Sequence, residues 1–336
     1  MIRTAVIGVG SMGKNHARVY TELPDVELVA VADADGEIAG AVGKRLGVKA
    51  YQNYQEMLSI EHPEAVSIAV PTALHMEVAM AAMQAGADIL IEKPIAATVD
   101  EAKFLIEQAS VSGRKLMVGH IARFNPAIQV LKQKLEAGAL GRIFQIICRR
   151  VGPFPARIRD VGVVVDLAPH DLDIMRYLTG LEPLRVYAET EQRIHTQHED
   201  LMSGLLRFPD GVTGTLEINW LTPTKVREVL VLGERGLFRV DDLTQDLYFY
   251  ENEQANGTLW PALQNLKGVS EGSMIRFALQ RYEPLKAELK GFLKAVQQDL
   301  PVPVSGADGL AALRLALALV ESGHSHQLIE VGYAFA

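Results

Sequence analysis

The residues Gly8-Val9-Gly10-Ser11-Met12-Gly13 stand between an apolar, strand-like run and an amphipathic stretch. Glycines at this spacing permit a tight turn, and the N-terminus of a following helix can then receive a pyrophosphate. An ordinary glycine-rich turn is the alternative, but the strand before the motif and the helix after it favour a dinucleotide site. The turn residues that we expect to bind the cofactor are Gly8, Gly10, Ser11, Met12 and Gly13.

Outward from this turn, residues 2 to about 120 alternate short β-type runs with amphipathic stretches. This alternation is typical of βαβ units around a parallel sheet. We therefore predict an α/β fold in which residues 1–121 form an N-terminal Rossmann domain for dinucleotide binding.

After Phe124 the pattern changes. We expect helices at about 126–137 and 168–178, strands from 143–150 onward, and two final helices at 283–298 and 306–322. Short alternating runs between residues 184 and 250, separated by glycine-containing turns, indicate a large and mainly antiparallel sheet. Residues 122–336 are thus predicted to form an α+β domain for substrate binding and oligomerisation. A sheet with one uncovered face suggests a homo-oligomer, a dimer or a tetramer.

The composition narrows the class of protein. The chain of 336 residues is 49% hydrophobic and 22% charged, which is ordinary for a globular protein of two domains. A net charge of -8 argues against a nucleic acid partner. The single cysteine, Cys148, cannot form an internal disulfide and fits a reducing compartment. Without a signal-peptide pattern or a run of about 20 apolar residues, we expect a cytoplasmic protein with no membrane partner.

Asp33 follows the second predicted strand, twenty residues after Gly13. At this position a carboxylate can accept hydrogen bonds from the adenosine ribose hydroxyls, and it would repel a 2′-phosphate. A solvated acidic turn shared with Asp35 is the alternative. The motif therefore predicts NAD rather than NADP as the cofactor.

The run Glu92-Lys93-Pro94 places a lysine at the carboxyl end of a predicted parallel strand, where ligands bind in open α/β sheets. Proline cannot continue the strand ladder and restricts the preceding residue to an extended or turn conformation. A strand-end lysine that merely faces solvent is the other interpretation of this pattern.

Asp166 and His170 are four residues apart, which sets both on one face of a helix. Histidine can accept a hydroxyl proton near neutral pH, and a nearby carboxylate can orient the ring and support the imidazolium. Helix capping by Asp166 beside a packed His170 remains open at this point.

Together these residues resemble the glucose-fructose oxidoreductase/inositol dehydrogenase/MocA family. Further matches follow the same order along the chain, namely Pro71-Thr72 with His75, Arg123-Phe124-Asn125-Pro126, and Val304-Ser305-Gly306-Ala307-Asp308-Gly309. The resemblance implies that Lys93 contacts the reacting hydroxyl and the nicotinamide region, and that Asp166 and His170 bind substrate and relay a proton. It also implies a cis Lys93-Pro94 bond. To the cofactor site we add Pro71, Thr72, His75, Glu92 and Lys93, and to the substrate site Lys93, Arg123, Asn125, Asp166 and His170.

Within that family, the run from Arg149 to Gly162 looks like the UDP-N-acetylglucosamine 3-dehydrogenase branch. It contains four arginines, and guanidinium groups suit bidentate binding of phosphate. We therefore expect Arg157 and Arg159 to help hold a diphosphate. A solvated basic loop or a subunit contact would explain the arginines equally well.

Two other functions remain possible from the sequence. A dehydrogenase of a free cyclic polyol or monosaccharide would not need the arginines, and a non-catalytic NAD-binding regulatory protein would not need Lys93, Asp166 and His170. No metal site is predicted, because the histidine pairs 195/198 and 324/326 lack further ligands that the sequence could place.

Overall fold

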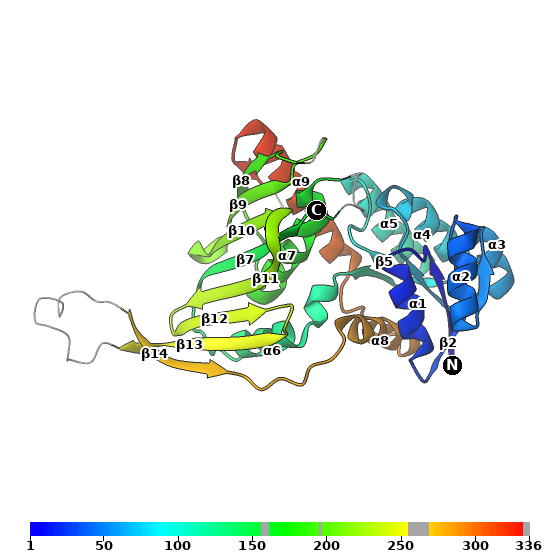
Figure 1. Cartoon of the computed structure of the whole chain (residues 1–336), viewed down its shortest axis with the longest axis horizontal. Helices are drawn as coiled ribbons and strands as arrows, with labels where there is room; N and C mark the ends of the chain where they lie inside the picture. The colour runs from blue at the N-terminus through cyan, green and yellow to red at the C-terminus, as the bar shows by residue number, and fades with distance from the viewer. Residues whose placement is uncertain (156–160, 195–196, 255–268, 332–336) are drawn as a thin grey trace, which may run out of the picture. The chain divides into compact units, whose positions relative to one another are not determined.

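The apolar run before the glycine turn forms the central strand of a parallel sheet (Figure 1). The structure is a computed structural model that describes residues 1–155, 161–194, 197–254 and 269–331. Its first sheet has the strand order β3-β2-β1-β4-β5-β6, with all pairs parallel. These strands are β1 (Ile2–Ile7), β2 (Val26–Ala32), β3 (Lys49–Tyr51), β4 (Ala65–Ile68), β5 (Asp88–Glu92) and β6 (Leu116–Gly119). This order reverses direction between β1 and β4, and ligands bind at the carboxyl ends of strands at such a point.

The helices of this unit connect successive strands, as the alternating pattern predicted. They are α1 (Gly13–Thr21), α2 (Gly36–Leu46), α3 (Tyr54–Glu61), η1 (Thr72–Leu74), α4 (His75–Gln84), α5 (Val99–Ser112) and η2 (Ile121–Phe124). The strands are buried along their length, with Val6, Val31 and Leu90 fully excluded from solvent. The core of the unit therefore lies between the sheet and the helices that cover it.

The C-terminal part of the chain contributes to both units. By their contacts, residues Met1–Phe124 and Glu283–Arg314 form one compact unit, and Asn125–Tyr282 with Leu315–Ala336 form the other. The predicted division into residues 1–121 and 122–336 differs, because α8 (Pro284–Gln297) packs against α1 in the first unit. Helix α9 (Gly306–Ser325) begins in the first unit and ends in the second.

The second unit is built on a large mixed sheet with the order β14-β13-β12-β11-β7-β10-β9-β8-β15. Its strands are β7 (Ile143–Pro153), β8 (Arg185–Glu191), β9 (Leu201–Arg207), β10 (Thr213–Asn219), β11 (Leu221–Gly233), β12 (Gly236–Asp241), β13 (Asp246–Gln254), β14 (Val269–Arg276) and β15 (Ile329–Glu330), with η3 (Pro209–Gly211) between β9 and β10. Only β7 and β10 pair in parallel among these described strands. The predicted mainly antiparallel sheet is thus confirmed.

Helices α6 (Pro126–Glu136) and α7 (Val163–Thr179) pack against this sheet. Inward-facing side chains of β7, such as Ile146 and Cys148, are fully buried beneath them. On the opposite face, paired positions place Leu205, Ile147 and Leu230 in one row across the strands. Leu205 is 56% exposed, so this face carries accessible aliphatic surface. The predicted homo-oligomer stays a prediction.

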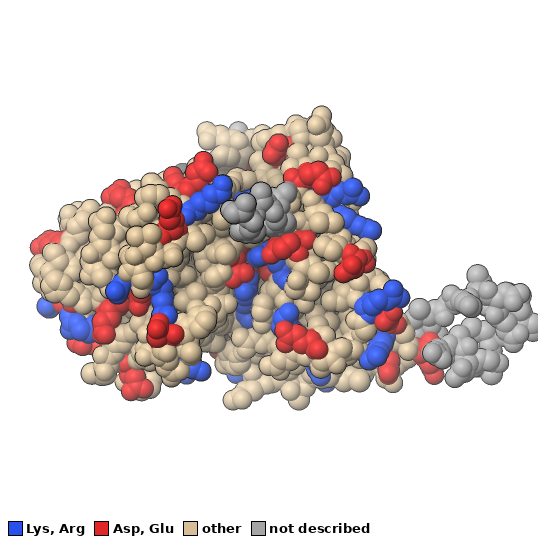
Figure 2. All heavy atoms as spheres, turned by 180° about the vertical axis from the view of Figure 1, so that it is seen from behind, with Lys and Arg blue, Asp and Glu red and all other residues tan. Residues whose placement is uncertain are grey.

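Charged side chains of both signs are interspersed on the face of the molecule drawn in Figure 2. A mixed surface of this kind produces little long-range attraction for an anion. An anionic substrate that approached this face would therefore depend on individual cationic side chains. Among the described residues, no helix combines the length and the apolar composition that crossing a bilayer requires.

The core of the first unit contains one ionisable side chain without a hydrogen-bond partner. Glu288 on α8 is 0% exposed, and neither of its carboxyl oxygens has a partner among the described residues. Burial raises the pKa of Glu288 well above its ordinary value, and the charge of Glu92 raises it further. The folded protein therefore favours a protonated Glu288.

Glu288→Gln should make the protein relatively more stable as the pH rises from 5 to 8. An unfolded glutamate releases its proton above a pKa of about 4.3, whereas the folded protein retains it. The free energy of unfolding of the wild type therefore falls with pH, by about 1.4 kcal/mol for each pH unit below the raised pKa. Glutamine has no proton to lose. Urea unfolding at both pH values measures the difference.

The matched control is Glu107→Gln, which changes an exposed glutamate on α5. Its stability difference from the wild type should stay constant between the two pH values. An equally constant difference for Glu288→Gln would show that the Glu288 side chain is ionised in the folded protein.

Candidate active site

The glycine turn between β1 and α1 has the geometry of a dinucleotide cradle. Gly8 has a φ of +82°, and a Cβ added to Gly13 would lie 1.7 Å from the carbonyl oxygen of Gly8. Only glycine permits both features. A Cβ added to Gly10 would meet nothing within 4 Å, so the space above the turn is open.

The residues between these glycines leave the start of α1 accessible. Ser11 is exposed, and Met12 precedes the helix without capping it through its side chain. The N–H groups of Lys14 and Asn15 already donate to the backbone oxygens of Gly10 and Met12, so a pyrophosphate would be received by the positive end of the helix and by N–H groups of the glycine turn. This geometry fits the predicted cofactor, which would be held here by backbone groups.

Asp33 follows β2 and lies beside the same turn. Its Oδ2 accepts a hydrogen bond of 2.8 Å from the backbone N–H of Val9, and its Oδ1 accepts one of 3.0 Å from Asp35. The carboxylate is thus fixed next to the glycine turn, where the ribose of a dinucleotide would lie.

The segment after β4 carries Pro71, Thr72 and His75. Pro71 is exposed and Thr72 half-buried, while His75 is 1% exposed at the start of α4. The Nδ1 of His75 lies 2.9 Å from the carbonyl oxygen of Pro94, and its Nε2 lies 3.0 Å from that of Val70. Burial lowers the pKa of His75, although these two carbonyls partly offset the effect. His75 therefore connects the loop after β4 to the loop that carries Lys93.

Lys93 follows directly after β5, and its peptide bond to Pro94 is cis, as the family resemblance implied. The preceding residue, Glu92, forms a contact of 2.9 Å between its Oε1 and the Nε2 of His16 on α1. Burial alone would raise the pKa of Glu92, but the hydrogen bond with His16 and the charges of His16 and Lys93 lower it overall. The backbone before Lys93 is thereby tied to α1.

This contact extends into a buried chain of hydrogen bonds. His16 Nδ1 lies 3.2 Å from Ser67 Oγ, which in turn lies 2.7 Å from the hydroxyl of Tyr20. Burial raises the pKa of Tyr20, so the phenol stays protonated. The sequence reasoning missed His16, whose only signal is its position three residues after the last glycine of the motif.

Asp166 and His170 both lie in α7, one turn apart, as their spacing predicted. The helix begins at Val163, five residues before the predicted start. Glu199 explains the earlier start, because its backbone oxygen and its Oε1 accept the N–H groups of Val163 and Val164. Gly162 is the N-cap residue, so Asp166 does not cap this helix.

Arg123 and Asn125 have clear structural partners. Arg123 Nη2 lies 2.9 Å from Asp308 Oδ1. Burial would raise the pKa of Asp308, but the charge and hydrogen bond of Arg123 lower it to about 2. Asn125 caps α6 through Ala127 and donates a hydrogen bond of 2.6 Å to Asp242. Their predicted roles at the substrate remain predictions.

Of the four arginines in the run from Arg149 to Gly162, two lie among the described residues. Arg157 and Arg159 lie outside the described residues. Arg149 is exposed and pairs with Glu217 at 2.9 Å. Arg150 is buried and donates two hydrogen bonds of 2.8 Å to Asp171 on α7. The described members of the run are therefore each bound to a carboxylate.

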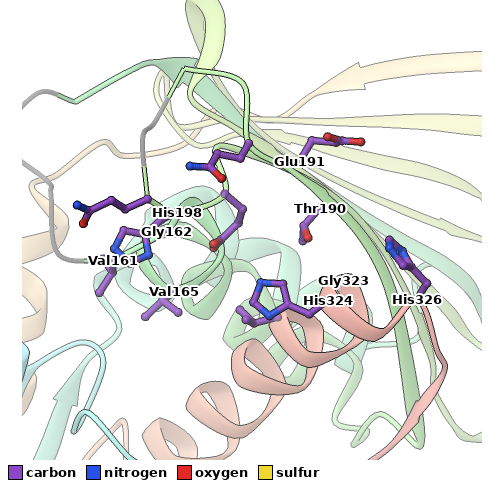
Figure 3. A pocket seen from close by; sticks show the side chains of 13 residues that line it. Val161, Gly162, Val165, Thr190, Glu191, His198, Gly323, His324 and His326 are labelled. Carbon is purple, nitrogen blue, oxygen red and sulfur yellow. The ribbon is translucent and has the colours of Figure 1, made fainter.

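A cavity of about 630 Å³ opens in the second unit at the N-terminal end of α7 (Figure 3). It brings His198 together with His324 and His326, which are far away in the sequence. His326 contacts Glu189 at 3.0 Å. Among the described residues, no group of three or more histidine, cysteine, aspartate or glutamate side chains is arranged to hold a metal ion.

Comparison with known proteins agrees with this geometry. Residues 2–120 match the oxidoreductase family with an NAD-binding Rossmann fold, and residues 128–239 match the GFO/IDH/MocA C-terminal domain. The UDP-N-acetylglucosamine 3-dehydrogenase of Acidithiobacillus ferrooxidans is 33% identical over 316 residues, covering 94% of this chain and 95% of that enzyme. The myo-inositol 2-dehydrogenase of Thermotoga maritima is 27% identical over 333 residues, covering 96% of each.

A solved structure of the Acidithiobacillus ferrooxidans enzyme has a TM-score of 0.84 and 32% identity, covering 96% of this chain and 98% of that chain. The fold and its cofactor turn define an NAD-dependent oxidoreductase that acts on CH–OH groups. The chain belongs to the GFO/IDH/MocA family.

Asp33→Ser should reduce the preference for NAD over NADP by about tenfold or more, because it removes the carboxylate that we expect to face an added 2′-phosphate. Dissociation constants of both cofactors, measured by fluorescence titration, give the ratio. Asp35→Ser is the matched control, since Asp35 only caps α2 and serine caps well. A wild type that binds NADP as tightly as NAD, with a ratio unchanged in Asp33→Ser, would remove Asp33 from the ribose site.

Proposed function

We propose that the protein oxidises a ring hydroxyl of a nucleotide-activated amino sugar, UDP-N-acetylglucosamine at C3, with NAD as the hydride acceptor. The observation that carries this proposal is the 33% identity to an enzyme of that name along 94% of the chain.

We assign the proton chemistry to three side chains. Lys93 donates a hydrogen bond to the reacting hydroxyl oxygen, and His170 accepts the hydroxyl proton. Asp166 binds the sugar and supports the imidazolium that results. The C–H bond of the same carbon breaks with both electrons, so a ketone forms. NAD supplies the acceptor for that hydride, and no other oxidant is needed.

Local structure supports these roles. Lys93 stands at the carboxyl end of β5, the position where open α/β sheets bind ligands. The Glu92 contact to His16 and the His75 contact to Pro94 hold the backbone on both sides of Lys93. Asp166 and His170 project from one face of α7 at a spacing of one turn. Both are partly exposed, so a substrate can reach them.

The remaining substrate contacts are part of the same proposal. We assign Arg157 and Arg159 to the diphosphate, and Arg123 and Asn125 to the edge of the sugar site. Glu92, Pro71, Thr72 and His75 border the nicotinamide half of the cofactor. The protein acts as a homo-oligomer whose contacts include the aliphatic row of the uncovered sheet face.

A dehydrogenase of a free cyclic polyol is the second candidate. The 27% identity to the myo-inositol 2-dehydrogenase of Thermotoga maritima favours it, as do the carboxylate partners of Arg149 and Arg150. Such an enzyme would bind a neutral ring and would need no cation for a diphosphate.

Purified enzyme with NAD should produce NADH from UDP-N-acetylglucosamine with a kcat/KM at least about tenfold above that for free N-acetylglucosamine. The diphosphate adds charged hydrogen bonds, whose binding energy helps to position the ring. Free hexoses and myo-inositol should be poorer still. Efficient oxidation of myo-inositol, with no NADH from the nucleotide sugar, would establish the second candidate instead.

A further inference from the structure

One arginine of the second unit lacks the carboxylate partner that its neighbours have. Arg227 lies on β11, directly opposite Arg150 on β7, so both side chains emerge on the same face of the sheet. Arg150 is bound to Asp171 through two hydrogen bonds. Arg227 Nη1 donates only to the backbone oxygens of Val151, at 2.6 Å, and Val226, at 2.7 Å. In the described part of the chain, no carboxylate lies within ion-pair distance of it.

The electrostatics of Arg227 show that its charge is incompletely balanced. Burial lowers the pKa of Arg227 to about 10, and the positive charge of Arg150 adds to that effect. Asp171, Asp242 and Asp166 oppose the shift without cancelling it. Asp171 is bound to Arg150, and Asp242 is bound to Asn125. A half-buried guanidinium in this state gains from any further anion.

Gly152 on β7 is buried and lies against both Arg227 and Lys225. A Cβ added to Gly152 would lie 3.9 Å from Arg227 Nη1 and 3.7 Å from Cα and Cγ of Lys225, which is ordinary van der Waals distance. Lys225 is exposed and lies on the same strand. The glycine thus leaves the Arg227 guanidinium without a neighbouring side chain at position 152, next to the backbone and stem of Lys225.

Asp166 relates Arg227 to the side chains that we assign to the reaction. Its carboxylate acts on the charge of Arg227, and it is one turn from His170 on α7. We propose that Arg227, assisted by Lys225, binds an oxyanion of the substrate, a phosphate or a carboxylate, beside Asp166. This inference builds on the proposed function, because it names the group that selects an anionic sugar.

Binding measurements on the full-length protein with NAD present test the proposal. Arg227→Gln should weaken the binding of UDP, or of glucuronate as the carboxylate probe, by about tenfold or more, as expected for the loss of a charged hydrogen bond. NAD affinity should be unchanged. Arg149→Gln is the matched control, because Arg149 is exposed and already paired with Glu217, and it should bind both probes like the wild type.

The two probes separate the two anion sources. A loss confined to UDP identifies a phosphate site, and a loss confined to glucuronate identifies a carboxylate site. Should Arg227→Gln fail to fold, Lys225→Gln provides the second variant. It should weaken the binding of the same probe by a smaller factor. Salt should weaken probe binding more in the wild type than in Lys225→Gln.

Each result bears on one of the two proposals. Unchanged binding in Arg227→Gln and Lys225→Gln, or a wild type that binds neither probe, overturns the oxyanion site. Turnover of UDP-N-acetylglucosamine that persists in Arg227→Gln at wild-type KM would do the same while leaving the proposed function intact. Glucuronate binding through Arg227, without turnover of the nucleotide sugar, would support the oxyanion site and contradict the proposed substrate.

Discussion

The close backbone approach between Gly8 and Gly13 is the constraint on which the site of the first unit depends. It sets α1 directly against the end of β1, with no room for a side chain at Gly13. Helix α1 then presents His16 to Glu92, the residue before Lys93. The turn that accommodates the cofactor and the strand end that carries the lysine are thereby joined through one buried hydrogen bond. The helix that begins at the cofactor turn therefore also helps to position the backbone before Lys93.

In the second unit, the equivalent support comes from carboxylates that are distant in sequence. Glu199 caps the first turn of α7, and Asp171 anchors the same helix to Arg150 on β7. These contacts fix the helix that carries Asp166 and His170. Because Asp171 is bound to Arg150, it does not form an ion pair with Arg227, and the charge of Arg227 is incompletely balanced. The pairing of Asp171 with Arg150 therefore anchors α7 to β7 and leaves Arg227 for the oxyanion that we propose it binds.

Local patterns predicted the parallel sheet, the mixed sheet and the spacing of Asp166 and His170, because each depends on residues within about one turn or one strand. The start of α7 was predicted too late, since its cap is supplied by Glu199, 35 residues further on. Strand β14 was missed, and β13 extends four residues beyond the predicted strand region, which ended at residue 250. The two strands pair across residues 255–268, so no short local pattern joins them. Arg227 has no local signal, and only the register of β11 against β7 places it beside Arg150.

We propose that Lys93 and His170 act on the reacting hydroxyl rather than on cofactor binding. Single-turnover formation of NADH by Lys93→Met and His170→Asn tests this assignment, together with the NAD affinity of each variant. The control is Lys103→Met, which changes an exposed residue on α5. We expect a rate at least about 100-fold lower in both variants, with NAD affinity retained. A near-wild-type rate in either variant would contradict the role assigned to that residue.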